Sequence, residues 1–261
     1  MARPLVYDTG MICHVGLVRQ VNEDSFLIRP GKGLWVVADG MGGHDSGRLA
    51  STTVVECLDG VEPADTASDL LAACELGLMR ANSILRETAR RRHVLAIGST
   101  VVLLLVHERV FAAVWSGDSR LYRVRGEAIA QITRDHSEAA ELLARGIVSE
   151  EEARHWPRRN VITRAIGVRE APELEIVDGE IAPDDIFVLC SDGLTTHMED
   201  DEIRREVLSG DAQAAADRML ATVLDRGAKD NVTAVVVKAR EREPTVVDPN
   251  GNLRRDWAPS A

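Results

Sequence analysis

The sequence predicts an α+β fold in which antiparallel β-sheets carry helices on their outer faces. Segments with strand character come in runs, and the long helical segments come in pairs between those runs. This order argues against a parallel sheet, in which strands and helices alternate singly. The chain has 261 residues, of which 45% are apolar and 28% charged, so it can bury a sizeable core. Length alone leaves one large domain or two small ones open.

The first part of the chain combines short strands with two helices. Apolar runs bounded by turn residues predict strands over 25–29 and 34–38, the second ending at Asp39 and Gly40. A helical pattern follows over 46–58. Apolar and small residues then recur at steps of three and four between residues 70 and 88, which is the spacing of one long amphipathic helix.

The rest of the chain is richer in strands. Two hairpins are predicted, 99–107 with 109–116 and 121–125 with 128–132, followed by short polar helices over 137–145 and 149–155. Further strands are expected at 161–165, 174–177 and 186–190, then helices at 200–208 and 211–226 and a last strand at 233–238. Residues 241–261 contain three prolines and few apolar residues, so we expect a flexible tail there.

Composition and charge exclude several classes of function. The net charge of -11 argues against non-specific binding to nucleic acid. Four cysteines without a C-x-x-C pair fit reduced thiols better than disulfides or a zinc site. The strongest apolar run, 101–106, is far shorter than the ~20 residues that cross a bilayer. No signal peptide and no coiled-coil heptad are visible, so we expect a cytoplasmic monomer without membrane association.

Four aspartates share one local pattern. Asp39 and Asp192 each follow an apolar strand and precede a glycine, Asp118 follows the strand over 109–116, and Asp230 precedes the last strand. A carboxylate at the end of a rigid strand is held still, and several such ends meeting at one edge would form an oxygen-rich site for Mg²⁺ or Mn²⁺. Asp-Gly is also a very common turn dipeptide, which is the better explanation for any one position alone. Four together favour a metal site.

Eight short motifs make this hypothesis specific. They are Asn-Glu-Asp-Ser at 22–25, Val-Ala-Asp-Gly-Met-Gly-Gly-His at 37–44, Gly-Ser-Thr at 98–100, Gly-Asp-Ser-Arg at 117–120, Thr-Arg-Asp-His-Ser at 133–137, Asn-Val-Ile-Thr-Arg-Ala-Ile-Gly at 160–167, Cys-Ser-Asp-Gly-Leu at 190–194 and Lys-Asp-Asn-Val-Thr at 229–233. In this order they resemble successive signatures of the metal-dependent protein phosphatases of type 2C, in their compact bacterial form. Each motif is a weak signal alone, but eight in order over roughly residues 9–238 are hard to attribute to chance.

The resemblance implies a fold, an activity and partners. The fold is a four-layer αββα sandwich of two stacked antiparallel sheets flanked by helix pairs. The catalytic domain spans residues 1–240, with a variable flap at about 138–160 beside the cleft and the tail at 241–261. The implied activity is hydrolysis of phosphoserine and phosphothreonine. The implied partners are phosphorylated proteins, together with a Ser/Thr kinase that shares those substrates.

Carried over residue by residue, the resemblance assigns roles to the acidic positions. Asp39 bridges two Mn²⁺ or Mg²⁺ ions, and the carbonyl of Gly40 binds one of them. Asp192 and Asp230 bind the first ion directly. The metal site is also supported, mainly through bound waters, by Glu23 and Asp24.

The family's chemistry needs no phospho-enzyme, because water between the two cations attacks phosphorus directly. Arg19 matches the family's arginine that grips the phosphoryl group. His44 is a candidate donor of a proton to the leaving alkoxide, and a loop histidine that hydrogen-bonds the turn explains it equally well. Asp118 and Asp192 match the ligands of a third ion, which we expect to bind weakly because Thr196 stands where many relatives carry another aspartate.

Two points stay open at the level of sequence. A basic group in the flap, formed by Arg154, His155, Arg158 and Arg159, could steer a phosphopeptide or simply form a solvated helix face. The alternatives to a protein phosphatase are a non-catalytic relative that binds phosphoproteins and a phosphatase of small phosphorylated metabolites. Every position needed for two metals is intact, which argues against the first alternative. Nothing in the sequence excludes the second.

Overall fold

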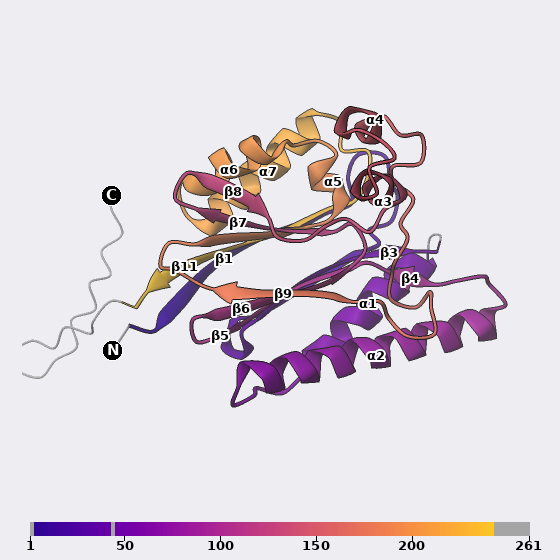
Figure 1. The fold of residues 1–261 in the computed structure, drawn as a ribbon, viewed down its shortest axis with the longest axis horizontal. Coiled ribbons are helices and arrows are strands. Elements are labelled where there is room, and N and C mark those ends of the chain that lie inside the picture. Colours follow the sequence, from indigo (N-terminus) through magenta and orange to yellow (C-terminus); the bar gives the residue numbers. More distant parts are fainter. Residues whose placement is uncertain (1–2, 43–44, 243–261) are drawn as a thin grey trace, which may run out of the picture.

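The computed structural model describes residues 3–42 and 45–242, and in it two antiparallel sheets lie face to face (Figure 1). The first sheet has the strand order β1-β11-β10-β7-β8, from Leu5–His14, Val232–Glu241, Ile186–Cys190, Arg120–Arg125 and Ala128–Gln131. The second has the order β2-β3-β5-β6-β9, from Asp24–Arg29, Leu34–Met41, Val101–His107, Val110–Ser116 and Glu175–Glu180. The short strand β4, Gly98–Ser99, also pairs with β3.

A helix pair covers the outer face of each sheet, as predicted. Helices α1 (Asp45–Asp59) and α2 (Ala67–Arg92) lie on the second sheet, and α6 (Asp200–Leu208) and α7 (Ala212–Asp225) on the first (Figure 1). The remaining short helices α3 (Glu138–Ala144), α4 (Glu150–Arg154) and α5 (Asp192–Thr195) gather at the end of the sandwich away from the two termini. A 3₁₀ turn, η1, spans Pro30–Lys32. The layers therefore form the expected αββα sandwich.

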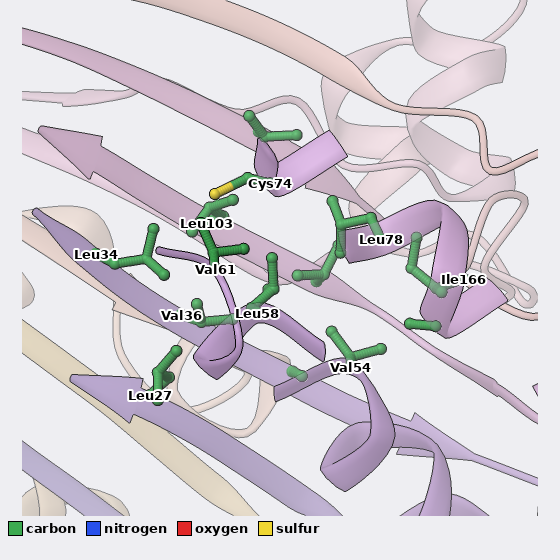
Figure 2. Packing of buried hydrophobic residues seen from close by; sticks show 14 of the residues in the cluster. Leu27, Leu34, Val36, Val54, Leu58, Val61, Cys74, Leu78, Leu103 and Ile166 are labelled. Carbon is green, nitrogen blue, oxygen red and sulfur yellow. The ribbon is translucent and has the colours of Figure 1, made fainter. Parts of the chain in front are cut away.

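Three apolar clusters hold the four layers together. One lies between α1, α2 and the second sheet, where Leu58 and Leu78 meet Val36 and Leu103 (Figure 2). Another fills the space between the sheets around Trp35 and is formed by inward side chains of both. The last packs α6 and α7 on the first sheet. Removing these apolar faces from water stabilises the sandwich, because each sheet is buried on both sides.

Local signals set the ends of the long helix α2. Thr66 has an extended backbone and its hydroxyl accepts a hydrogen bond from the backbone N–H of Asp69, which satisfies one of the free donors of the first turn. At the other end His93 adopts a left-handed conformation, and its N–H bonds to the last carbonyls of the helix. These caps explain why the helix extends a few residues beyond the apolar pattern at each end.

Several sequence predictions need correction. The strand expected at 161–165 is absent from this part of the described chain, where Ile162 makes only an isolated bridge with Ser137. Strand β1 was not predicted, because it is a partly buried edge strand in which Asp8 and Gly10 interrupt the apolar pattern. Strand β3 continues past Asp39 to Met41 because β4 pairs with it there.

The end of the domain also differs slightly from the prediction. Glu241, the first residue of the expected tail, is the last residue of β11, and the backbone N–H of Arg242 bonds to the carbonyl of Pro4. The rest of that tail, 243–261, lies outside the described residues. All four cysteines are free thiols. Within 3–42 and 45–242, no helix combines the length and the apolar character needed to cross a membrane.

Candidate metal centre and active site

The predicted acidic residues come together at one end of the sandwich, from both sheets. Asp24 and Asp39 face each other in the register of the antiparallel pair β2 and β3. Asp118 lies in the turn between β6 and β7, and Asp192 is the first residue of α5, directly after β10 and Ser191. Asp230 comes two residues before β11. The pairing of β2 with β3 and the ends of the other strands thus bring together carboxyl groups that are far apart in the chain.

These carboxyl groups lie close enough to shift one another's pKa values. The pKa of Asp39 is raised well above its usual value, first by the protein packed around it and then by the charges of Asp24, Asp192, Asp118 and Asp230. Burial, followed by neighbouring carboxylates, raises the pKa of Asp24 and of Asp118 to about 7. The pKa of Asp192 rises to about 6, again through burial and then the charge of Asp230. Like charges in a buried place are costly unless a cation offsets them.

Arg19 is the basic residue that meets this acidic group directly. Its Nη2 lies 2.7 Å from Oδ2 of Asp230, and the two side chains are 52% and 41% exposed. This hydrogen bond and the charge of Asp230 raise the pKa of Arg19, and the charges of Glu23 and Asp39 act in the same direction. The guanidinium fork therefore stands at the open side of the carboxylates, where a phosphoryl group could reach it.

Gly40 and Gly47 lie beside Glu23 where neighbouring atoms leave no space for a side chain. A Cβ on Gly40 would lie 1.9 Å from the carbonyl oxygen of Gly47 in α1. A Cβ on Gly47 would in turn lie 2.3 Å from Glu23 Oε1 and 2.8 Å from the carbonyl oxygen of Gly40. Two oxygens thus converge on a cradle that only glycine leaves open.

Three further polar residues position the carboxylates, and the motifs that contain them gave them no role of their own. The Asn231 side chain accepts from the Glu23 N–H (2.8 Å) and donates to the carbonyls of Val15 (2.9 Å) and Val21 (3.0 Å). Ser191 Oγ donates to Asp24 Oδ2 at 2.9 Å.

Thr100 is the last of the three. Its Oγ1 accepts from the Asp39 N–H at 3.0 Å, and its own N–H donates to the Asp39 carbonyl at 2.8 Å. Asn231, Ser191 and Thr100 are at most 5% exposed, and a buried polar residue beside a motif carboxylate is the signal that identifies such supports.

The donor set suits a hard divalent cation. Asp24 Oδ1 is buried and has no hydrogen-bond partner among the residues that the structure describes, which is unfavourable unless a cation or an ordered water completes it. Within 3–42 and 45–242, no three Asp, Glu, His or Cys side chains form a closed metal site by themselves. Ions held here would therefore draw on backbone carbonyls such as that of Gly40 and on water, as Mg²⁺ sites commonly do.

A cleft of about 760 Å³ leads from these carboxylates to the flap. Asp118 and Asp192 line its inner part, and Arg154 and Arg159 line the flap side. Of the other two flap residues, Arg158 pairs with Glu138 at 3.0 Å and the His155 ring contacts the Glu151 carbonyl at 2.9 Å. The flap predicted at about 138–160 thus lies beside the cleft, and two of its four basic residues face it. His44, the candidate proton donor, lies outside the described residues.

The family follows from comparison with known proteins. The model of the family described as "Protein phosphatase 2C" matches residues 17–237, which include every one of these carboxylates. The chain belongs to the protein phosphatase 2C family. Its relatives include the Ser/Thr protein phosphatase PstP of Mycobacterium tuberculosis, 34% identical over 222 residues. That match covers 85% of this chain and 43% of the relative, so the chain spans less than half the length of PstP.

Solved structures of the protein phosphatase 2C fold agree with this assignment. PppA of Pseudomonas aeruginosa, described as a key regulatory component of T6SS, is 42% identical with a TM-score of 0.83, covering 89% of this chain and 97% of PppA. A structure of the PstP catalytic domain in complex with two manganese ions is 31% identical with a TM-score of 0.82. It covers 90% of this chain and 99% of that domain. The sandwich described here is thus the fold of that manganese-bound PstP domain.

Proposed function

We propose that this protein is a metal-dependent phosphatase that hydrolyses phosphoserine and phosphothreonine in proteins. The observation that carries the proposal is the meeting of five buried or half-buried aspartates with Arg19 at the end of an open cleft. Carboxylates whose pKa values are raised by one another are suited to bind divalent cations, and a guanidinium beside them is suited to bind a phosphoryl dianion.

Within this proposal each acidic residue has a place. Asp39 would contact both ions and the Gly40 carbonyl one of them, while Asp192 and Asp230 would hold the first ion directly. Glu23 and Asp24 would act mainly through water, and Asp118 with Asp192 would hold a weaker third ion. The bound cations would be Mn²⁺ or Mg²⁺. They would supply a water of lowered pKa and positive charge near the phosphoryl oxygens.

The protein's own groups do the remaining work. Arg19 Nη2 donates to Asp230 Oδ2, and the guanidinium fork is suited to donate two N–H bonds to two phosphoryl oxygens. Thr100 and Ser191 keep Asp39 and Asp24 in place during turnover, which limits reorganisation as charge develops. A proton must reach the leaving alkoxide, and His44, which ends the Gly-rich motif that begins after Asp39, remains the proposed donor.

The cleft supports a protein substrate over a small metabolite. A volume of about 760 Å³, with an opening along the flap, accepts an extended peptide segment, whereas a small phosphoester would fill only the part near Asp192. We therefore extend the proposal to phosphorylated proteins as partners, together with the kinase that modifies them. A cytoplasmic location and a monomeric state complete the proposal.

Phosphate release tests the proposed function. The substrates are a phosphothreonine peptide, p-nitrophenyl phosphate and a small phosphorylated metabolite, each with Mn²⁺, with Mg²⁺ and with excess EDTA. We expect the peptide to give the highest kcat/KM and EDTA to abolish every rate. Turnover that survives EDTA, or none with either metal, would contradict the metal mechanism. A preference for the metabolite would instead favour the metabolite phosphatase.

A further inference from the structure

His136 is a buried imidazole that the proposed chemistry leaves without a role. It lies between β8 and α3, is 2% exposed, and stacks on Trp115 of β6 with ring centroids 5.9 Å apart and planes inclined by 15°. Trp115 is itself fixed, because its Nε1 donates to the Arg134 carbonyl at 2.9 Å. The orientation of the imidazole is therefore set by packing before any polar contact is considered.

Two hydrogen bonds tie His136 to Gly117, the residue before Asp118. The Gly117 N–H donates to His136 Nδ1 at 3.1 Å, and the His136 N–H donates to the Gly117 carbonyl at 2.9 Å. A backbone N–H can only donate, so Nδ1 carries no proton and the neutral ring is protonated at Nε2. Nε2 faces Glu175 Oε1 of β9 at 3.3 Å, an acceptor that fits this tautomer. Arg164 Nη1 also lies 3.3 Å from Nε2, but a guanidinium can only donate, so in this tautomer the two groups make no hydrogen bond to each other.

The Gly117 peptide is confined from its other side as well. Gly117 has φ +118°, and a Cβ there would lie 2.6 Å from Thr100 Cβ. Thr100 also holds the residue after Asp118, because its Oγ1 lies 2.8 Å from Ser119 Oγ. Thr100 also binds both the N–H and the carbonyl of Asp39. Because Gly117 packs against Thr100 and precedes Asp118, the orientation of the Gly117 peptide sets the position of Asp118 relative to Asp39.

His136 also joins this turn to the base of the flap. Its carbonyl accepts from the Thr163 N–H at 2.8 Å, where the chain leaves the flap. The next residue, Ser137, caps α3, where the chain enters the flap. One residue thus contacts the Asp118 turn, the flap base and, through Glu175, the edge strand of the second sheet.

We propose that His136 is a positioning residue whose Nδ1 acceptor holds the Gly117 peptide so that Asp118 faces the metal centre. The inference rests on the proposed function for the role of Asp118. The cause is geometric: without an acceptor at Nδ1, the Gly117 N–H has no partner and the peptide is free to rotate away from His136. Asp118 would then be presented to the weaker third cation less often, and affinity for that ion would fall.

Two near-isosteric variants separate the two ring nitrogens. In His136→Asn the amide oxygen reaches the Nδ1 position, whereas in His136→Gln the amide reaches the Nε2 position and leaves Gly117 without an acceptor. Mn²⁺ binding is measured by isothermal titration calorimetry, beside kcat and KM for a phosphothreonine peptide. We expect His136→Gln to weaken the weakest Mn²⁺ step about 10-fold, in line with other residues that orient metal ligands. We expect His136→Asn to stay within about 3-fold of wild type, because it keeps the acceptor.

Asp118→Asn provides the matched background. If His136 acts through Asp118, adding His136→Gln to Asp118→Asn should cause no further loss of Mn²⁺ affinity. Equal losses in the Asn and Gln variants, or fully additive losses in the double variant, would overturn the inference and leave a packing role only. A further outcome is that the wild type releases phosphate with Mn²⁺ while both His136 variants bind Mn²⁺ and turn over substrate as it does. That result would overturn the inference and leave the proposed function intact.

A measurement on the wild-type chain guards against variants that do not fold. The ¹⁵N chemical shifts of the His136 ring distinguish a protonated from an unprotonated nitrogen. We expect an unprotonated Nδ1 and a protonated Nε2. A protonated Nδ1 would overturn the inference without any mutation. If the wild type binds no Mn²⁺, the proposed function fails, and the inference fails with it because Asp118 then has no ion to face.

Discussion

Arg19 Nη2 lies 2.7 Å from Asp230 Oδ2, an ion pair between residues 211 positions apart in the chain. The contact joins the loop before β2 to the turn before β11, and both side chains remain about half exposed. An exposed pair of this kind contributes little to stability, about 0–1 kcal/mol. Its position beside the carboxylates therefore points to a role in function.

Replacing Arg19 should affect substrate affinity more than folding. In Arg19→Ala we expect KM for p-nitrophenyl phosphate to rise about 10-fold or more, because charge-assisted bonds of about 1.5–3 kcal/mol to the phosphoryl group are lost. Arg19→Lys keeps the charge but not the fork, so an intermediate KM is expected. Steady-state kinetics of the wild type and both variants measure KM, and urea unfolding of the same proteins controls for folding. An unchanged KM in Arg19→Ala would contradict the role of Arg19 in binding the phosphoryl group.

Gly40 should not tolerate a side chain. We expect Gly40→Ala to lower the free energy of unfolding by about 3 kcal/mol or more, because its Cβ would lie 1.9 Å from the Gly47 carbonyl oxygen. Gly31 is the matched control, since a Cβ there meets nothing within 4 Å. For Gly31→Ala we expect a change within about 0.5 kcal/mol. Similar urea midpoints for the two variants would contradict the close packing of Gly40 against the Gly47 carbonyl.

Asn231 should support both the fold and the metal centre. Asn231→Ala removes the partners of the Val15 and Val21 carbonyls and of the Glu23 N–H, so we expect a loss of about 3 kcal/mol and weaker Mn²⁺ binding. Asn160, an exposed asparagine of the flap, serves as the control, and its alanine variant should be near neutral. Calorimetric unfolding with and without Mn²⁺ measures both effects. A near-neutral Asn231→Ala would contradict the supporting role.

The metal-free protein should lose stability as pH rises from 6.5 to 8. The pKa values of Asp24 and Asp118 are raised to about 7, so in this range the folded state binds more protons than the unfolded state, and deprotonation costs stability. The lowered pKa values of His136 and His197 act in the opposite direction, mainly below their usual value of about 6.5. Urea unfolding in EDTA at several pH values measures the slope.

Mn²⁺ should reverse that pH dependence, because the cation competes with protons for the same oxygens. We expect the increase in unfolding midpoint on adding Mn²⁺ to be larger at pH 8 than at pH 6.5. Asp24→Asn removes one of the titrating groups and should flatten the slope in EDTA. A metal-free protein that becomes more stable between these pH values would contradict the picture of crowded carboxylates.

Periodicity and turn residues predicted most of the fold. The amphipathic spacing in α2 and the hairpins β5–β6 and β7–β8 depend on local pattern, which is why these elements were predicted close to their observed bounds. Strand β1 depends instead on pairing with β11 across the whole chain, and Asp8 and Gly10 hide its strand character. The segment at 161–165 has β-branched residues, but it closes the flap base, and within the described part of the chain no strand pairs with it along its length.

Part of the site was predictable as well, because some of its residues carry a local sequence pattern. Asp39 and Asp192 carry a local signature, a carboxylate at a strand end beside glycine, so the sequence indicates them directly. The roles of Asn231 and His136 come from hydrogen bonds to backbone groups far away in the chain, at Val15 and Gly117, and no local pattern encodes those contacts. Carboxylates could thus be inferred from the sequence, whereas the residues that orient them required the structure.

Mn²⁺ binding to Asp39→Asn tests the central claim most directly. Asparagine has nearly the same shape as aspartate and cannot carry its charge, and the raised pKa of Asp39 indicates that the folded chain accommodates a neutral group there. We expect calorimetry to show two tight Mn²⁺ sites in the wild type and a large loss of affinity at both in the variant, with thermal unfolding at least as high in EDTA. A variant that binds two Mn²⁺ ions with wild-type affinity would contradict the shared metal centre.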